Sequence, residues 1–165
     1  MHWYLVHTKP RLEKTALENL ERQHYRCYLP MLMTEKLRKG EVTLVEEPLF
    51  PRYLFIQLDT GMSALSWSPI RSTKGVNRLV SFGNEPAKVH DALIETLQSH
   101  EQELHSQPVA LFTPGERVQV TQGPFAGVEG IYQMTDGERR VMVLIELMSK
   151  PVTLPLAPSA LRKVN

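Results

Sequence analysis

The chain has 165 residues, enough for one ordinary domain or two small ones. Its 19 basic and 18 acidic side chains leave a net charge of +1, so overall charge does not by itself predict a nucleic-acid binder. A hydrophobic content of 42% excludes a wholly disordered chain, and no apolar run approaches the roughly 20 residues that cross a membrane. The single cysteine, Cys27, cannot form an internal disulfide, and no signal peptide is recognisable, so a cytoplasmic protein is expected.

Basic residues are concentrated near the N-terminus. Residues 1–40 contain eight Lys or Arg and four Glu, a local charge of +4, so an anionic partner is expected to bind there. A helix is predicted at 11–24. Its period, continued to residue 26, gives a polar stripe on the side opposite the apolar residues, and this stripe consists of Arg11, Thr15, Arg22 and Arg26. Two interpretations stay open, a surface that contacts phosphates or guanine edges and a merely solvated outer face.

The first hundred residues alternate between short strands and helices. Aromatic and β-branched residues predict strands, which fall at 3–8, 26–29, 31–37, 42–45, 49–58 and 76–82. Apolar periodicity predicts helices at 11–24, at about 62–67 and at 89–103. The sequence therefore predicts an α+β sandwich over residues 1–103, with helices packed against a mainly antiparallel sheet.

The C-terminal third has a different pattern. A polar run that ends in Pro108 predicts a linker at 104–112. Between 113 and 165, four or five short alternating runs separated by Gly and Pro predict a small β-barrel. The segment 139–149 fits both a strand and a helix; its three β-branched residues and Pro151 favour a strand, and the helical alternative stays open.

The strand predicted at 53–58 is apolar on both faces. Leu54 and Ile56 belong to one face, and Tyr53 and Phe55 to the other. If helices cover only one side of the sheet, the second face is an exposed aromatic surface of the kind that binds a protein partner. Burial of that face beneath the remaining helix is the alternative.

No catalytic or metal-binding arrangement is recognisable. The six histidines form no HExxH motif, and Cys27 has no second cysteine for a zinc site. The sequence also contains no glycine-rich nucleotide-binding motif such as Walker A or GxGxxG. The sequence therefore predicts a non-enzymatic protein with no cofactor and no metal.

The most specific string runs from Pro114 to Ile131 and contains Gly-Pro-Phe-Ala-Gly at 123–127. It resembles a KOW motif, in which such a turn joins two strands and Gly130 permits tight curvature. Together with Trp3-Tyr4, the run Leu49 to Phe55 and Thr73-Lys74-Gly75-Val76, it resembles the NusG family of transcription elongation factors. The runs 27–31 and 47–51 are most similar to the RfaH-type antitermination branch of that family.

The resemblance implies an N-terminal NGN domain that binds RNA polymerase and a C-terminal KOW domain. The positions that match a hydrophobic patch for the β′ clamp helices are Phe50, Tyr53, Phe55, Leu79 and Phe82, with His7 beside them. The positions that match a contact with the β gate loop are Ser66, Trp67 and Ser68, where the family usually carries His-Thr-Thr.

The resemblance also implies contact with the non-template DNA strand at an ops-type pause element. The matching residues are Lys9, Arg22, Gln23 and Lys74. Arg11, which belongs to the polar stripe, is expected to bind DNA beside them. Thr15 and Asn19 stand where well-known members carry basic residues. We therefore expect an operon-specific factor that suppresses pausing and termination, acting as a monomer without membrane contact.

RfaH-type proteins hide the polymerase patch under a C-terminal domain folded as an α-helical hairpin. After release, that domain refolds into the KOW barrel and contacts ribosomal protein S10. The resemblance makes Glu47 and Arg140 the partners of an interdomain salt bridge. Two alternatives stay open, a general NusG that recruits Rho and a ribosome-associated KOW protein that binds RNA.

Overall fold

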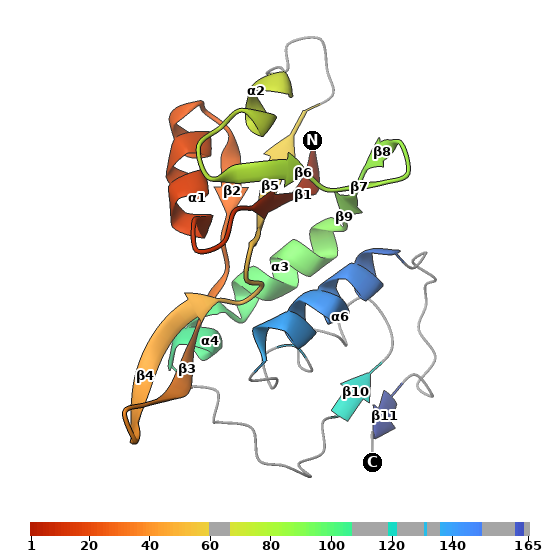
Figure 1. The fold of residues 1–165 in the computed structure, drawn as a ribbon. Coiled ribbons are helices and arrows are strands. Elements are labelled where there is room, and N and C mark those ends of the chain that lie inside the picture. Colours follow the sequence, from red (N-terminus) through yellow and green to blue (C-terminus); the bar gives the residue numbers. More distant parts are fainter. Residues whose placement is uncertain (60–66, 107–118, 122–130, 132–135, 150–160, 164–165) are drawn as a thin grey trace. The chain divides into compact units, whose positions relative to one another are not determined.

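The computed structural model describes residues 1–59, 67–106, 119–121, 131, 136–149 and 161–163. The chain divides into two compact units that interleave in sequence (Figure 1). Unit 1 comprises Met1–Leu29 and Phe50–Asp91, and unit 2 comprises Pro30–Leu49 and Ala92–Asn165. Among the described residues, no helix has both the length and the apolar character needed to span a membrane.

Unit 1 contains an antiparallel sheet. The strands are β1 (His2–Thr8), β2 (Arg26–Tyr28), β5 (Tyr53–Leu58), β6 (Val76–Leu79) and β9 (Lys88–Val89). Their hydrogen-bonded order is β2-β5-β1-β6, and β9 also pairs with β1. A short hairpin follows β6, formed by β7 (Ser81–Phe82) and β8 (Glu85–Pro86). The prediction of a mixed α+β fold with an antiparallel sheet is confirmed.

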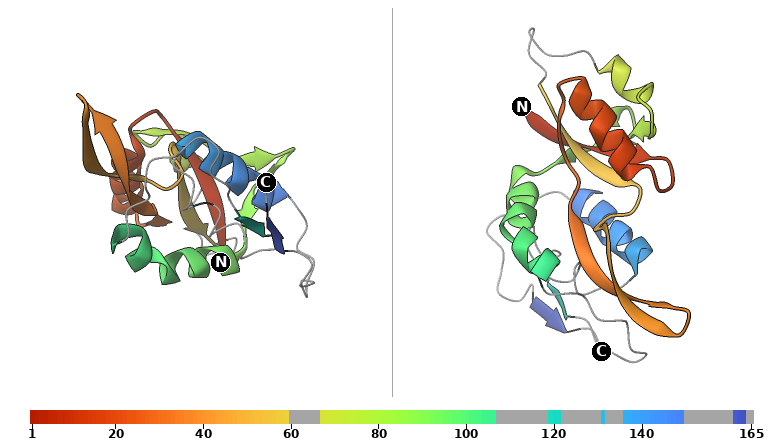
Figure 2. Two further views of the ribbon diagram at one scale, coloured as in Figure 1. Left: turned by 90° about the horizontal axis from the view of Figure 1, so that it is seen from below. Right: turned by 90° about the vertical axis from the view of Figure 1, so that its left-hand side faces the viewer.

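Helices cover one face of this sheet. They are α1 (Glu13–Arg22) and α2 (Ser68–Arg71), and Figure 2 shows α1 lying across the strands. Alternation along β1 and β5 turns Tyr4, Val6, Leu54 and Ile56 toward them. These side chains form one buried cluster with residues of the helices, chiefly Ala16, Leu20 and Ile70. The opposite face of the sheet carries the aromatic residues described below.

The described residues of unit 2 include a long hairpin, the helices α3, α4 and α6, and a small two-stranded sheet. The elements are β3 (Met31–Arg38), β4 (Glu41–Pro48), α3 (Asp91–Ser99), α4 (Glu101–Ser106), α6 (Gly137–Ser149), β10 (Gln119–Thr121) and β11 (Leu161–Lys163). The hairpin β3–β4 pairs antiparallel over its whole length, from Met31 opposite Pro48 to Arg38 opposite Glu41. β10 and β11 are also antiparallel.

The preference for a strand at 139–149 is wrong, because these residues lie in α6. Arg140, Leu144 and Met148 recur every four residues and are all buried, so the segment buries one helical stripe. Asp136 supports the start of the helix, since its carboxylate accepts a hydrogen bond of 2.9 Å from the Glu138 amide. Burial of the stripe outweighs the local preference of the β-branched residues for strand.

Other boundaries also differ from those predicted. α1 spans only Glu13–Arg22, so Arg11 and Arg26 lie outside it and the predicted four-residue stripe is reduced to Thr15 and Arg22. The helix expected at 62–67 falls largely outside the described residues, and α2 begins at Ser68. α4 extends through Ser106, into the first residues of the expected linker. Most of the KOW-like string lies outside the described residues.

Candidate functional site

The aromatic face of the unit 1 sheet is organised in rows across neighbouring strands. Cross-strand pairing places Arg78, His7 and Tyr53 in one row, on β6, β1 and β5. The next row contains Leu5 and Phe55, and β2 adds Tyr28 beside Phe55. The sheet therefore brings His7 to Tyr53 and Phe55, as expected for a single patch, and the His7 and Tyr53 ring centroids lie 4.9 Å apart.

The two phenylalanines of this face are buried. Phe50 and Phe55 are each only 1% exposed, and their rings meet edge to face with centroids 6.0 Å apart. Tyr28 also stacks with Phe55, with ring centroids 6.2 Å apart. Tyr53, in contrast, is half-buried. Of the two alternatives for Phe55, burial therefore holds in this structure, and Tyr53 is the aromatic side chain of β5 that reaches solvent.

His7 lies at the polar edge of the aromatic face. Asn77 Nδ2 lies 2.8 Å from His7 Nδ1, so the ring nitrogen accepts a hydrogen bond from the amide. Partial burial lowers the pKa of His7, and the positive charges of Arg52 and Arg78 lower it further. These effects favour the neutral form of the imidazole. Arg52 and Arg78, which sequence reasoning left out, give this end of the patch a positive charge.

Leu79 does not join the patch. Leu79 pairs with Val6 and packs against the helix-covered face, opposite to Tyr53 and Phe55. The pairing of β1 with β6 is irregular between His7 and Thr8, and a local sequence pattern does not reveal that irregularity. Phe82 is 42% exposed on the small hairpin β7–β8.

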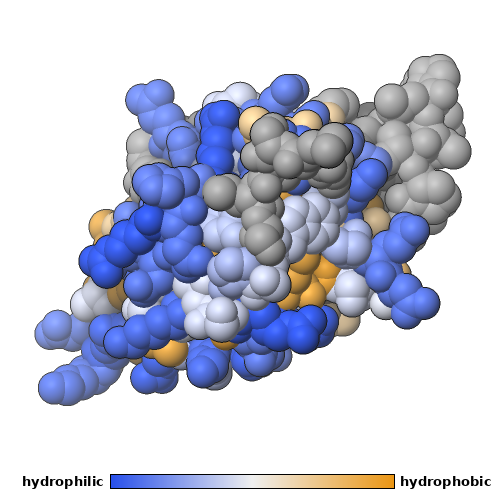
Figure 3. Space-filling view, turned by 90° about the horizontal axis from the view of Figure 1, so that it is seen from above, coloured by the Kyte–Doolittle hydropathy of each residue, from blue (hydrophilic) through white to orange (hydrophobic). Residues whose placement is uncertain are grey.

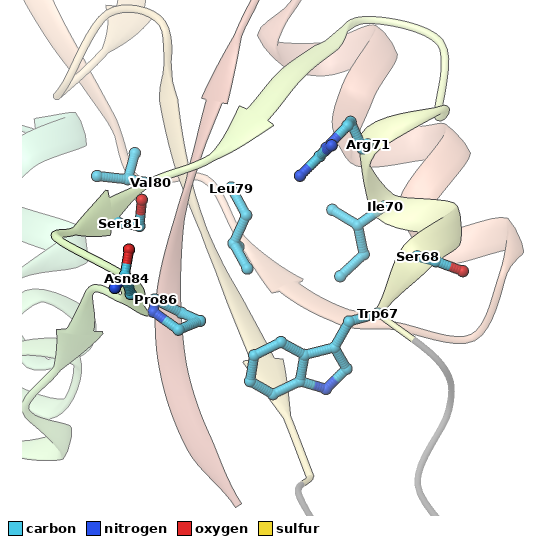
Figure 4. A pocket seen from close by; sticks show the side chains of 9 residues that line it. All are labelled: Trp67, Ser68, Ile70, Arg71, Leu79, Val80, Ser81, Asn84 and Pro86. Atoms are coloured by element: carbon cyan, nitrogen blue, oxygen red, sulfur yellow. The ribbon is translucent and has the colours of Figure 1, made fainter.

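Leu79 instead lines a pocket of about 470 Å³ between α2 and the β6–β8 segment (Figure 4). Trp67 closes one side, and its ring is fixed by an edge contact with Tyr4 at 5.0 Å between centroids. Of the three residues expected to contact a gate loop, Trp67 and Ser68 line this pocket. Ser66 lies outside the described residues.

The expected DNA-binding residues gather around α1 and the loop that precedes β6. Gln23 Nε2 donates a hydrogen bond of 2.8 Å to Thr73 Oγ1, which ties the C-terminal end of α1 to this loop. Gly75, at φ +92°, lies so close to α1 that an added Cβ would stand 2.9 Å from the Ala16 nitrogen. Lys74, between these two attachments, is therefore held alongside the helix with its side chain exposed.

The remaining basic residues extend this surface. The Lys9 amide donates to the Gly75 carbonyl at 2.8 Å, which places Lys9 next to the same loop. Arg11 (φ 64°) and Arg22 are exposed at the two ends of α1. Hydrophilic side chains also dominate the coloured surface in Figure 3. The arrangement provides several cations at a rigid surface, which suits a phosphate backbone.

A buried ion pair lies within unit 2. Arg140 is fully buried, and its guanidinium nitrogen lies 3.2 Å from a Glu47 carboxylate oxygen. Arg140 Nε also donates to the Leu49 carbonyl at 2.7 Å. Burial lowers the pKa of Arg140, and the Glu47 carboxylate opposes this shift. The two residues expected as ion-pair partners therefore meet, and they join α6 to the base of the β3–β4 hairpin.

The described residues contain no group of three or more His, Cys, Asp or Glu side chains that could hold a metal ion. Burial raises the pKa of the Cys27 thiol to about 12, and Glu21 adds to the shift. The thiolate that a nucleophilic cysteine needs is therefore scarce at neutral pH.

Comparisons with known proteins agree with a transcription factor. The family model described as "Transcription termination factor nusG" matches residues 1–98. The NusG transcription termination/antitermination protein of Thermus thermophilus is 30% identical over 93% of this chain and 95% of its own length. The corresponding protein of Escherichia coli K12 is 28% identical over 92% of this chain and 84% of its own length.

Among solved structures, one described as "Domain interaction in Thermotoga maritima NusG" is similar with a TM-score of 0.48. It is 24% identical in sequence, and the similarity covers 75% of this chain and 74% of that one.

Proposed function

Because the chain belongs to the NusG family of transcription termination and antitermination factors, we propose that it is an RfaH-type antitermination factor. In this proposal it binds RNA polymerase at a pause element, holds the non-template DNA strand, and suppresses pausing and termination in selected operons. The runs 27–31 and 47–51 support this branch of the family. Positioning a polymerase and a DNA strand requires binding surfaces and no cofactor.

The polymerase surface is the aromatic face of the unit 1 sheet. Tyr53, Phe55 and His7 lie together there, flanked by Arg52 and Arg78. Aromatic and arginine side chains are the residues that most often dominate protein interfaces. Phe50 and Phe55 are buried in the structure, so this surface must be uncovered before they can contact the β′ clamp helices. Trp67 and Ser68, at the pocket beside α2, are proposed to meet the β gate loop.

The observation that carries the RfaH-type proposal is the anchoring of α6. A segment with β-branched residues is helical, and its buried Arg140 binds Glu47 and the Leu49 carbonyl. These acceptors directly precede Phe50 in the chain, the first aromatic residue of the proposed patch. We propose that the C-terminal segment in this form conceals the patch. After release, residues 113–165 form a KOW barrel that contacts ribosomal protein S10.

A protease site placed in the segment 107–112 tests this proposal. Before cleavage, the full chain should bind core RNA polymerase weakly; after cleavage, residues 113–165 can leave and binding should increase. Circular dichroism should show a loss of helix at the same time, because α6 loses its site. Equal polymerase binding by the intact and the cleaved protein, with unchanged helix content, would contradict autoinhibition.

A second candidate is a general NusG function. The relatives reported above all bear that name, and they match over most of their length. A general factor has an open arrangement and recruits Rho. In that case the intact protein binds polymerase without cleavage and increases Rho-dependent termination. The RfaH-type proposal instead expects it to reduce termination, and only on templates that carry its pause element.

A further inference from the structure

Two guanidinium groups lie on either side of His7 at the polar edge of the aromatic face. Arg78 is opposite His7 in the pairing of β6 with β1, and Tyr53 is opposite His7 on the other neighbouring strand, β5. Arg52 directly precedes Tyr53, and its Nε donates to the carbonyl of Thr8 at 3.4 Å. Both arginines are exposed, so their positive charges are available to a partner.

His7 adds a third hydrogen-bond donor between the two arginines. Its Nδ1 accepts a hydrogen bond of 2.8 Å from the side-chain amide of Asn77. In the neutral imidazole the hydrogen is therefore on Nε2, which can only donate. Among the described residues, none accepts this hydrogen. The three side chains thus form a row of donors.

Arg52 has a backbone conformation that favours glycine. Its φ is 71°, in the left-handed region that few residues with a Cβ adopt. Two hydrogen bonds hold it there: its amide donates to the Glu13 carboxylate at 3.0 Å, and its carbonyl accepts from the Thr8 amide at 2.8 Å. Glu13 is buried, so water does not compete for the first of these bonds. An arginine held in place against backbone strain points to a role for its side chain.

The positive charge of this row is not neutralised within the part of the chain that the structure describes. There, neither Arg52 nor Arg78 forms an ion pair. A group with two acceptor oxygens and a negative charge fits such a row, and both a carboxylate and a phosphate have this chemistry. The half-buried Tyr53 beside the row favours a protein, since tyrosine and arginine are enriched in protein interfaces.

We propose that Arg52, His7 and Arg78 together bind one acidic side chain of a protein partner, beside the apolar contact made by Tyr53. This inference rests on the proposed function, in which the partner of this face is RNA polymerase, and it assigns an Asp or Glu to the polymerase surface that docks here. Glu13 is a positioning residue, because it holds the backbone of Arg52 in the conformation that the contact requires.

Zero-length cross-linking tests for the carboxylate itself. The full chain is cleaved at a protease site placed in 107–112 and mixed with core RNA polymerase that has been freed of nucleic acid. Arg52→Lys and Arg78→Lys keep the positive charge and supply a primary amine. A carbodiimide condenses this amine with a carboxylate in contact with it, and takes up the water that is released. We expect mass spectrometry to find both lysines joined to acidic side chains of polymerase.

A matched control for the cross-link is Arg38→Lys, at the exposed end of β3. This lysine carries the same amine away from the donor row, and it should not be joined to polymerase.

Affinity measurements assign the contact to its residues. Arg52→Gly removes the guanidinium and suits a φ of 71°, so it should keep the fold while weakening polymerase binding about fivefold, the effect of one exposed ion pair. High salt should shrink this difference. Glu13→Gln should also weaken binding, but it should have no further effect in the Arg52→Gly protein. A merely structural role of Glu13 would weaken binding equally in both backgrounds.

The outcomes separate this inference from the proposed function. Binding that depends on Tyr53 but is unchanged in Arg52→Gly and Arg78→Gln, with no cross-link from either lysine, would overturn the acidic contact alone. A loss in Arg52→Gly that appears only with polymerase carrying DNA would identify a phosphate and would also overturn it. Failure of the cleaved chain to bind polymerase at all would overturn the polymerase surface together with the contact.

Discussion

Glu47→Gln removes the counter-charge of a fully buried guanidinium while it keeps the shape of the side chain. Breaking a buried ion pair by deleting one partner costs about 3–5 kcal/mol, because the remaining charge has no water around it. The Glu47 side chain is 18% exposed and Arg140 keeps its bond to the Leu49 carbonyl, so the cost falls at or just below the lower end of this range. We expect Glu47→Gln to lower the free energy of unfolding by about 2–3 kcal/mol.

A second ion pair of the same carboxylate provides a matched control. Glu47 also pairs with Lys36 at 3.5 Å, and the Lys36 side chain is 40% exposed. Lys36→Gln should therefore cost only about 0–1 kcal/mol, and 1 M salt should abolish that cost. Urea unfolding followed by circular dichroism at 222 nm measures both variants. Equal losses for Lys36→Gln and Glu47→Gln would refute the argument that burial of Arg140 gives the pair its energy.

Three further predictions concern unit 1. Gly75→Ala should lower the melting temperature far more than Gly40→Ala, because both glycines have positive φ but only Gly75 lacks room for a Cβ. Tyr53→Ala should reduce polymerase binding in a pull-down with little loss of stability, whereas Phe55→Ala should cost about 3–5 kcal/mol in urea unfolding because Phe55 is buried. Iodoacetamide at pH 8 should alkylate Cys27 roughly a hundred- to a thousandfold more slowly in the folded than in the unfolded protein. The reason is that a thiol pKa of about 12 leaves little thiolate in the folded protein. Equal alkylation rates would contradict the burial of that thiol.

Local pattern was sufficient to predict most of unit 1 and the hairpin of unit 2. In unit 1, alternation and β-branched residues locate β1 and β5, and apolar periodicity locates α1. The same alternation locates the β3–β4 hairpin of unit 2. The two faces of β5 also follow from alternation, with Leu54 and Ile56 on the helix-covered side. The face of Leu79 depends on an irregular strand pairing, and such pairing is a property of two distant segments.

The helix α6 shows where local pattern leaves two alternatives and favours the wrong one. Its buried stripe begins with Arg140, and a charged residue is normally assigned to the surface, so the stripe is not recognised as apolar. The partner that makes this burial possible, Glu47, is 93 positions away in the sequence. A local signal for the helix did exist, since Asp136 followed by Glu138 is a common way to begin one. For the basic surface, the four-residue spacing of Thr15, Asn19 and Gln23 is visible in the sequence, but the direction of the Asn19 and Gln23 side-chain amides is not.

Because Arg140 lies far along the chain from its acceptors, the ribosome makes the acceptors well before it makes Arg140. The Leu49 carbonyl that receives Arg140 Nε is made 91 residues earlier. At roughly 5–20 residues per second, a ribosome needs about 5–18 s to add the intervening chain. Throughout that interval the nascent protein has the base of its hairpin but not yet the helix that docks there. Each newly made molecule therefore passes through a period in which this docking site is vacant, before the chain is complete.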